Sequence, residues 1–295
     1  VSQTATKIHP LDTSREDIEK NLEHFRNAVE KNDPGAQKTA AGVLSKALEL
    51  NQWRARETLY LVPSGPFYFV PWGALNIETP VIVLPNGGWI VRLTKSWNGK
   101  KTASVVGDPD FAGKLPQLPG ARIEAQEIAA LYGTQPLIGA SATENALRAD
   151  IGDGVKVLHL ATHGHFNAAQ PLQSAVVLRG QNHVHYLTAE RLFKNPLAAR
   201  LVVLSACETG AGKAIAGDDF LGLTRSLYLG GAITVLNSLW SIDDMGTLEF
   251  MKKFHSAAQQ GDYGQAWLAA RNHLRKLGYP PSVYGAFVLG GASSD

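Results

Sequence analysis

The chain has 295 residues, of which 44% are hydrophobic and 18% are charged, so it can bury a large core and wholesale disorder is excluded. Its 28 basic and 26 acidic residues leave a net charge of +2 with no basic block, and we expect no obligate nucleic-acid partner. No apolar run reaches the ~18 residues that span a bilayer, so we expect no membrane partner.

Cys207 is the single cysteine of the chain. An intrachain disulfide is therefore impossible, and a secreted scaffold held by disulfides is excluded. We expect a reducing, cytoplasmic location. The sequence starts at Val1, and its two methionines are Met245 and Met251. We interpret it as a fragment or a processed piece of a longer chain.

The first 56 residues have helical patterns. Apolar residues recur at helical spacing between 18 and 29, the sequence Asn32–Gly35 predicts a stop, and a second helical pattern covers 43–48. This pair predicts a helical hairpin. We interpret residues 1–56 as a helical N-terminal segment, in the form expected for the stub of a helical-repeat region, and residues 57–295 as one further domain.

The pattern then changes to short β-rich runs, and after Lys101 to alternating strands and helices. Near-continuous apolar strands separated by helices predict an α/β fold with a mostly parallel sheet covered on both faces. The predicted strands are 58–62, 67–70, 81–84, 89–93, 103–106, 155–161, 201–206 and 232–239, and the predicted helices are 122–132, 142–149, 219–229, 243–260 and 263–277.

Two of these strands lead directly into reactive side chains, His163 and Cys207. Ligands of parallel α/β sheets lie beyond the carboxyl ends of the strands, so the imidazole and the thiol meet there if the two strands are neighbours. A nearby imidazolium favours the thiolate, and the imidazole can protonate a leaving amine. The backbone N–H groups of Gly164 and Cys207 are candidates for an oxyanion hole.

Other interpretations of these residues stay open. A lone cysteine at a strand end is often a small buried hydrophobe, and a histidine there is often structural. We interpret His159 as structural and His165 as a residue of the rim. His163 with His165, and His183 with His185, form two His-x-His pairs that could hold zinc, although no carboxylate follows at the spacings usual for a hydrolase.

Three ordered motifs closely resemble the CHAT domain, which is grouped with separase among the caspase-like, clan CD cysteine peptidases. They are Leu158–Gly164, Leu204–Gly210 and Ser238–Trp240. Further segments also resemble the family: 61–75 as its opening hairpin, 107–109 and 115–125 as its middle, and 286–291 as its closing strand. The resemblance covers about residues 57 to 291.

The resemblance implies a caspase-like α/β/α sandwich with Cys207 as the nucleophile and His163 as the general acid/base. The implied activity is that of a cysteine endopeptidase that cleaves a protein substrate through this dyad, with no metal or organic cofactor. Family members are often joined to tetratricopeptide-type repeats or other sensors. This implies a peptidase that is latent until a sensor or helical-repeat partner activates it, in a bacterial regulatory or defence pathway. The loop 210–219 directly follows the nucleophile and contains three glycines without a strong helix or strand pattern, so we expect it to order on activation.

Two alternatives are a non-catalytic interaction module on a caspase-like fold and a zinc hydrolase that uses the His-x-His pairs.

The specificity pocket is the least defined part of this hypothesis. In caspase-like folds the S1 pocket is built from the nucleophile strand and the strand beside it. Trp240 could form an apolar wall there, and Asp243 or Asp244 its base, which would select Lys or Arg at P1. The same aspartates also suit the N-terminus of the following helix, and both roles stay open. Asp218 and Asp219 are further candidates for substrate binding, because their loop follows the cysteine.

Overall fold

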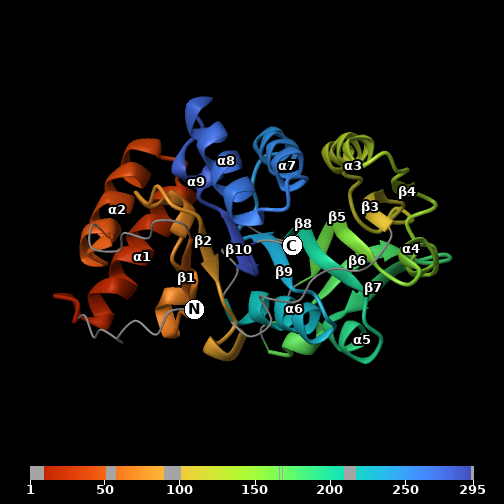
Figure 1. The fold of residues 1–295 in the computed structure, drawn as a ribbon, viewed down its shortest axis with the longest axis horizontal. Helices are drawn as coiled ribbons and strands as arrows, with labels where there is room; N and C mark the ends of the chain where they lie inside the picture. The colour runs from red at the N-terminus through yellow and green to blue at the C-terminus, as the bar shows by residue number, and fades with distance from the viewer. Residues whose placement is uncertain are drawn as a thin grey trace.

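The computed structural model describes residues 10–50, 58–89, 101–165, 167, 169–208 and 217–293, and for residues 69, 206–208 and 217–222 it describes the backbone alone. The strands form one mixed sheet through the middle of the molecule, with helices on both faces (Figure 1). The predicted α/β fold with a mostly parallel sheet is confirmed.

The N-terminal part forms two antiparallel helices, α1 (Arg15–Glu30) and α2 (Pro34–Ala47). Both begin at capping residues that satisfy free backbone N–H groups. Ser14 and Asp17 form a reciprocal capping box at the start of α1, and the Asp33 side chain caps α2.

The helical hairpin packs into the main body. Leu22, Phe25 and Leu44 belong to the same hydrophobic cluster as the sheet and the C-terminal helices. Gln37, which is fully buried, accepts a hydrogen bond from the backbone N–H of Ser282 at 3.0 Å. The hairpin is therefore held both by apolar contacts and by a hydrogen bond between segments that are far apart in sequence.

The main path of the sheet has the spatial order β1-β2-β10-β9-β8-β5-β3-β4. Neighbours on this path are parallel, except that β10 runs antiparallel to β9. An antiparallel hairpin of β6 and β7 is attached to the end of β5. The bounds are β1 (Leu59–Leu61), β2 (Val81–Val83), β3 (Lys101–Pro109), β4 (Leu137–Gly139), β5 (Val155–His165), β6 (Ala175–Arg179), β7 (Val184–Thr188), β8 (Ala199–Glu208), β9 (Thr234–Ser238) and β10 (Phe287–Gly291).

The helices form two layers around this sheet (Figure 1). Successive strand residues point to opposite faces, so Val105 joins the cluster under one layer and Val106 the cluster under the other. One layer holds α3 (Pro119–Leu131), α7 (Asp244–Ala258), α8 (Tyr263–Lys276) and α9 (Pro281–Tyr284), and the other holds α4 (Glu144–Ile151), α5 (Ala189–Lys194) and α6 (Gly217–Leu229). Three short 3₁₀ helices, η2 (Gly65–Phe69), η3 (Trp72–Ala74) and η5 (Pro171–Gln173), lie in the connections.

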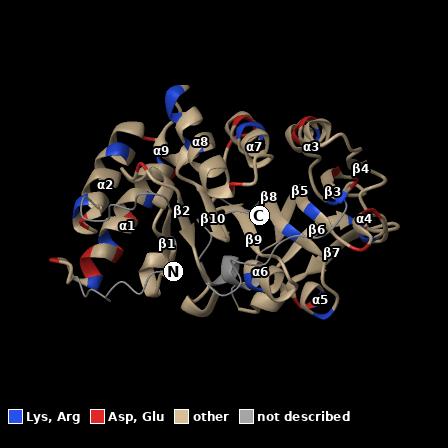
Figure 2. Ribbon diagram, in the orientation of Figure 1, with Lys and Arg blue, Asp and Glu red and all other residues tan. Residues whose placement is uncertain are grey.

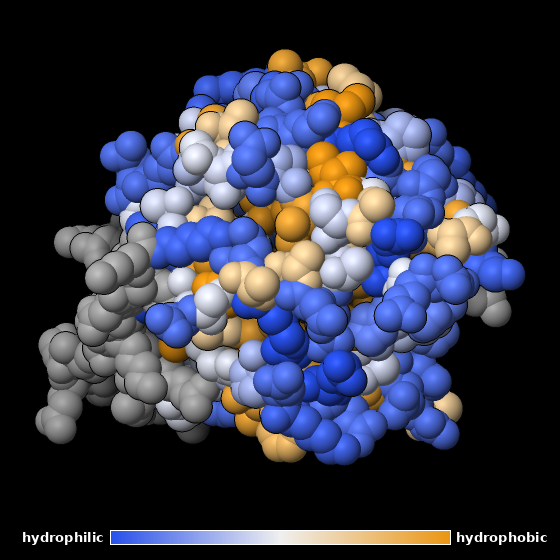
Figure 3. Space-filling view, turned by 90° about the vertical axis from the view of Figure 1, so that its right-hand side faces the viewer, coloured by the Kyte–Doolittle hydropathy of each residue, from blue (hydrophilic) through white to orange (hydrophobic). Residues whose placement is uncertain are grey.

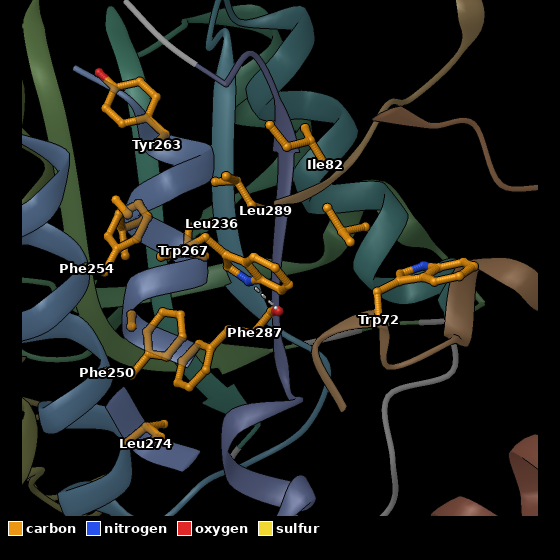
Figure 4. Close-up of a cluster of buried hydrophobic side chains, with 14 of the residues drawn as sticks. Trp72, Ile82, Leu236, Phe250, Phe254, Tyr263, Trp267, Leu274, Phe287 and Leu289 are labelled. Carbon is orange, nitrogen blue, oxygen red and sulfur yellow. Dashed lines mark hydrogen bonds between the residues drawn. The ribbon is translucent and has the colours of Figure 1, made fainter. Parts of the chain in front are cut away.

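Aromatic residues fill the core under α7 and α8 (Figure 4). The rings of Phe250 and Phe287 stack with centroids 3.6 Å apart. Trp267 is 1% exposed and its indole N–H donates to the carbonyl of Phe287 at 3.0 Å. Burial of each such side chain contributes roughly 1.5–3 kcal/mol, so this cluster fixes α7 and α8 to β10.

The charged residues lie mainly on the outer sides of the helices, and basic residues also occur on strands near β5 and β8 (Figure 2). On the face over β4 and α4, hydrophilic residues dominate and hydrophobic ones gather near the centre (Figure 3). None of the helices in the described ranges is both long and apolar enough to cross a membrane.

Two predictions for the segment before β2 are wrong. The predicted strand 67–70 falls mostly in the 3₁₀ helix η2, and the expected opening hairpin at 61–75 does not form, because β1 pairs with β2 in parallel. Pro63 and Pro66 cannot donate to a strand ladder, and Gly65 has φ +55°, which turns the chain away from extended structure. The predicted strand 89–93 lies outside the described residues after Trp89.

Candidate active site

His163 and Cys207 occupy equivalent positions on two neighbouring parallel strands. β5 pairs with β8 over nine registered positions, and His163 is registered directly with Cys207. Neighbouring strands lie roughly 4.8 Å apart, so the two backbones are in direct contact at the carboxyl end of the sheet. The two strands are therefore neighbours, which is the condition that the sequence analysis set for His163 and Cys207 to lie together.

The β6–β7 hairpin fixes the end of β5. The hydroxyl of Thr162 donates to the carbonyl of Val177 at 2.6 Å, and Gly164 is registered with Val176 in antiparallel pairing. Residues 155–164 of β5 are, apart from Lys156, buried in the interior. The backbone at His163 is therefore anchored from both sides, by β8 and by β6.

The side chain of His163 lies beneath the loop that connects β3 to α3. It is 3% exposed, and its ring centroid lies 4.6 Å from that of Phe111. The ring atom Nε2 is 2.8 Å from the carbonyl oxygen of Pro116. A carbonyl can only accept a hydrogen bond, so Nε2 carries the proton and donates it. In the neutral ring, Nδ1 is then the nitrogen that can accept a proton.

The pKa of His163 is lowered from its ordinary value of 6.5. Burial is the main cause, since it disfavours the charged ring. The hydrogen bond to Pro116 and the negative charge of Asp108 oppose this effect. The imidazole is therefore predominantly neutral at pH 7, which is the form that a general base requires.

The two candidate oxyanion donors lie at the same edge. Gly164 is buried and directly follows His163, and it is registered with Glu208, the residue after Cys207. The structure thus brings the backbones of Gly164 and Cys207 together on adjacent strands. The side chain of Cys207 lies outside the described part of the structure.

The two candidate aspartates of the specificity pocket occupy different positions. The carboxylate of Asp243 accepts a hydrogen bond from the N–H of Gly246 at 2.8 Å and caps α7. The carboxylate of Asp244 instead lies against Gly120 in the first turn of α3. One residue therefore caps the helix, while the other extends toward the segment that follows the loop above His163.

Trp240 contacts the helical hairpin. Its indole N–H donates to the carbonyl of Ser282 at 2.7 Å, and its ring lies 6.2 Å from that of Phe25 in α1. The backbones of Asp218 and Asp219 open α6, but their side chains lie outside the described part, as do all atoms of residues 209–216, which include most of the loop expected to order on activation.

Two further histidines of the zinc alternative, His165 and His185, contact other groups. His165 is exposed and packs its ring edge-on against Tyr186 at 5.5 Å, and His185 Nε2 is 2.7 Å from a carboxylate oxygen of Glu144. Among the side chains that the structure describes, no group of three or more His, Cys, Asp or Glu residues is arranged as metal ligands.

A family model for the CHAT domain matches residues 36–289, from within α2 to β10. The chain belongs to the CHAT domain family. Among curated proteins, tetratricopeptide repeat protein 28 of Mus musculus is 26% identical over 69% of this chain, and that of Homo sapiens is 25% identical over 64%. The CHAT chain spans 11% and 9% of the length of these two relatives.

Solved structures confirm a caspase-like fold for this CHAT domain. Saccharomyces cerevisiae separase, in complex with securin, matches with a TM-score of 0.54 and 15% identity over 86% of this chain and 17% of its own. The Arg-specific cysteine proteinase gingipain R matches with a TM-score of 0.52 and 10% identity over 95% of this chain and 75% of its own. A chain from the complex of the Porphyromonas gingivalis RgpB pro- and mature domains matches with a TM-score of 0.52 and 11% identity over 94% of this chain and 76% of its own.

His159 lies in the core of the CHAT domain, within a chain of buried polar groups. Its Nε2 is 2.9 Å from a carboxylate oxygen of Glu124, and its Nδ1 is 3.1 Å from Nε2 of His255. The other ring nitrogen of His255 is 3.1 Å from the hydroxyl of Tyr132. These groups join β5 to α3 and α7, so His159 has a structural position.

Sequence reasoning did not identify the groups that contact His163. Pro116 contributes a backbone carbonyl, which has no residue-type signature, and Phe111 has the ordinary pattern of a buried aromatic. One available signal was Asp108, a carboxylate at the carboxyl end of β3, the strand next to β5. Polar residues at this edge of a parallel sheet are typical of functional sites.

Proposed function

We propose that this CHAT domain is a cysteine endopeptidase in which Cys207 is the nucleophile and His163 is the general acid/base. The observation that carries the proposal is the direct registration of the two residues at the carboxyl ends of adjacent strands. The second support is the donation of Nε2–H to Pro116, which leaves Nδ1 as the nitrogen that exchanges a proton with the thiol.

The reaction proceeds in two steps. Nδ1 of His163 takes the proton of the Cys207 thiol, and the thiolate attacks the carbonyl carbon of the scissile peptide bond. The C–N bond then breaks, the leaving amine receives the proton from Nδ1, and a thioester remains. In the second step His163 removes a proton from water, the hydroxide attacks the thioester, and the thiol and the carboxylic acid are released. The N–H groups of Gly164 and Cys207 stabilise the oxyanion in both steps.

The substrate is a protein with a basic P1 residue. Asp244 supports this part of the proposal, because its carboxylate does not cap α7 and instead lies against the start of α3. The start of α3 is close in sequence to Pro116, the residue that contacts His163. A guanidinium or ammonium group would bind it through a charge-assisted hydrogen bond. Trp240 lies four residues before Asp244 and supplies apolar surface on the side of the hairpin.

Activity depends on a helical-repeat partner or sensor. The mouse and human relatives are named as tetratricopeptide repeat proteins. In this chain the α1–α2 hairpin is packed into the core of the peptidase domain. A bacterial regulatory or defence role, in which a sensor releases one limited cleavage, belongs to this proposal on the family resemblance alone.

The test is cleavage-site mapping in a proteome, by labelling of new N-termini, with wild-type protein and Cys207→Ala side by side. The cysteine peptidase is supported by cleavage sites that appear with wild type and persist when a chelator is present. These sites should disappear with Cys207→Ala and after treatment with iodoacetamide. Loss of cleavage on chelation would favour the zinc hydrolase. The absence of new termini, with the helical-repeat partner present, would favour the interaction module.

A further inference from the structure

Asp108 has an unusual backbone conformation at the end of β3. It is 2% exposed and has φ +43°, in the left-handed region that Asp and Asn occupy more readily than other residues with side chains. β3 is the neighbour of β5 on the side away from β8. Asp108 therefore lies at the same edge of the sheet as His163, on the adjacent strand.

The carboxylate of Asp108 holds the far end of the β3–α3 loop. Its Oδ1 accepts hydrogen bonds from the backbone N–H of Leu118 at 2.7 Å and from the amide of Gln117 at 3.0 Å. Its Oδ2 accepts from Nε of Arg122 at 2.8 Å. Three donors to one buried carboxylate form a strong anchor, because hydrogen bonds to a charged acceptor are about twice as strong as neutral ones.

The anchored loop carries both groups that contact His163. Phe111 and Pro116 lie between Asp108 and Leu118 in sequence, and they supply the ring contact and the carbonyl acceptor. Gln117 also accepts from the N–H of Phe111, at 3.4 Å. The carboxylate, the amide of Gln117 and the loop thus form one hydrogen-bonded unit above the imidazole.

We propose that Asp108 is a positioning residue for His163, which holds the β3–α3 loop so that Pro116 accepts the Nε2 proton and Nδ1 remains available for the thiol. The consequence for catalysis rests on the proposed function. The effect on the tautomer and pKa of the His163 ring is independent of that function, because it can be measured without turnover. Asp108 acts through the loop and touches neither the substrate nor the reacting atoms.

A simple ion pair does not account for this arrangement. The Arg122 side chain is 46% exposed, and an exposed ion pair contributes little to stability. The carboxylate, in contrast, is buried and satisfied mainly by the loop itself. Its negative charge also raises the pKa of His163, against the larger effect of burial.

Asp108→Asn is the decisive variant. Asparagine tolerates the same backbone conformation and can still accept from Leu118, but it loses the charge that holds Arg122. The control is Asp110→Asn, which removes one charge from the same loop at a half-exposed side chain that pairs with Arg179. The readout is ¹⁵N NMR of the His163 ring, assigned by loss of its signals in His163→Gln.

Wild type and Asp110→Asn should show a single tautomer with the proton on Nε2. Asp108→Asn should show a mixture of tautomers and a lower pKa of His163, and its kcat/KM should fall by about 10- to 100-fold with little change in KM. Unchanged tautomer and pKa in a folded Asp108→Asn protein would overturn the proposal.

A second variant tests the proposal if Asp108→Asn does not fold. Gln117→Ala removes one of the three donors and the contact with Phe111, and it should produce the same change in tautomer to a smaller extent; an unchanged ring in this variant would also count against the proposal. If the ring responds as expected while the wild type cleaves nothing, the positioning role stands and the peptidase proposal fails.

Discussion

The carboxylate of Asp244, in the first turn of α7, lies directly over Gly120 in the first turn of α3. A Cβ atom at position 120 would overlap this carboxylate, so the absence of a side chain there creates the space that Asp244 occupies. Both helices begin at the edge of the sheet that carries His163. Asp244 is exposed at this edge, and the proposed specificity pocket uses its carboxylate to bind the substrate side chain.

We expect a preference for Lys or Arg at P1 that depends on Asp244. Asp244→Asn should lower kcat/KM for substrates with basic P1 residues by about tenfold or more, because a charge-assisted hydrogen bond is lost. Gly120→Ala should have the same direction of effect, since it displaces the carboxylate. The measurement is a P1 peptide library with each variant.

Asp243→Asn is the matched control, because asparagine caps helices as well as aspartate and should leave P1 preference unchanged. Asp243→Ala should instead lower the free energy of unfolding by about 0.5–2 kcal/mol. A library in which wild type prefers an apolar or acidic P1 residue would eliminate the pocket.

Substitution of either dyad residue should abolish cleavage without unfolding the protein. Cys207→Ala removes the nucleophile, and His163→Ala removes a proton transfer that is worth about 10²- to 10⁴-fold. His165→Ala is the control, since His165 is exposed and packs on Tyr186. Rates on one peptide substrate, with circular dichroism of each variant, decide the assignment. A near-normal rate for His163→Ala together with a lost rate for His165→Ala would reverse it.

The single thiol offers a substrate-free measurement. If His163 exchanges a proton with Cys207, alkylation of the thiol should rise with pH around a midpoint below the value of ~8.5 of a free cysteine. His163→Ala should move the midpoint upward. An ordinary thiol profile in wild type would favour the non-catalytic module.

Stability should fall in mild acid because of His255. Burial, and then the neighbouring His159, hold the pKa of His255 well below 6.5. The ring is neutral in the folded state and takes up a proton more readily in the unfolded chain, so the unfolded state gains protons as the pH falls below 6.5. Unfolding by urea should therefore need less denaturant from about pH 6.5 downward.

The variant that tests this effect is His255→Gln, which cannot titrate and should lose stability less steeply over the same range. The groups that face His255 are His159 from β5 and Tyr132, which directly follows α3. Glu124 contacts His159 on its other side. If the urea concentration needed for unfolding fell equally steeply with pH in the variant and in wild type, a role for this ring would be refuted.

Latency gives a further expectation. Residues 1–295 alone should cleave weakly, and addition of the activating helical-repeat partner should raise kcat/KM strongly, because we propose that activation orders the loop 210–219 after the nucleophile. Full activity of the isolated chain, unchanged by any partner, would contradict this.

The long apolar strands were predictable because their residues are buried on both faces. The runs before His163 and Cys207 are mostly aliphatic, as is typical of the strands of a parallel sheet. The 3₁₀ turn at Gly65–Phe69 was misassigned because Phe67 to Val70 has the composition of a strand, while the prolines around it remove backbone donors.

The contacts around His163 could not be predicted from a pattern of residue types. Pro116 acts through its backbone carbonyl, and its position depends on hydrogen bonds between Asp108 and residues nine to fourteen positions later. The separate positions of Asp243 and Asp244 likewise depend on α3 packing beside α7, which local sequence does not specify.

The position of β10 determines when the domain can be assembled during synthesis. This strand, at the end of the described chain, lies between β9 and β2, so it is the link between the half of the sheet with β1 and β2 and the half with β5 and β8. A ribosome releases the N-terminal parts first. The early strands and the helical hairpin must therefore wait, without their final partner, until residues 287–291 have emerged, and the complete sheet of the CHAT domain forms only after that point.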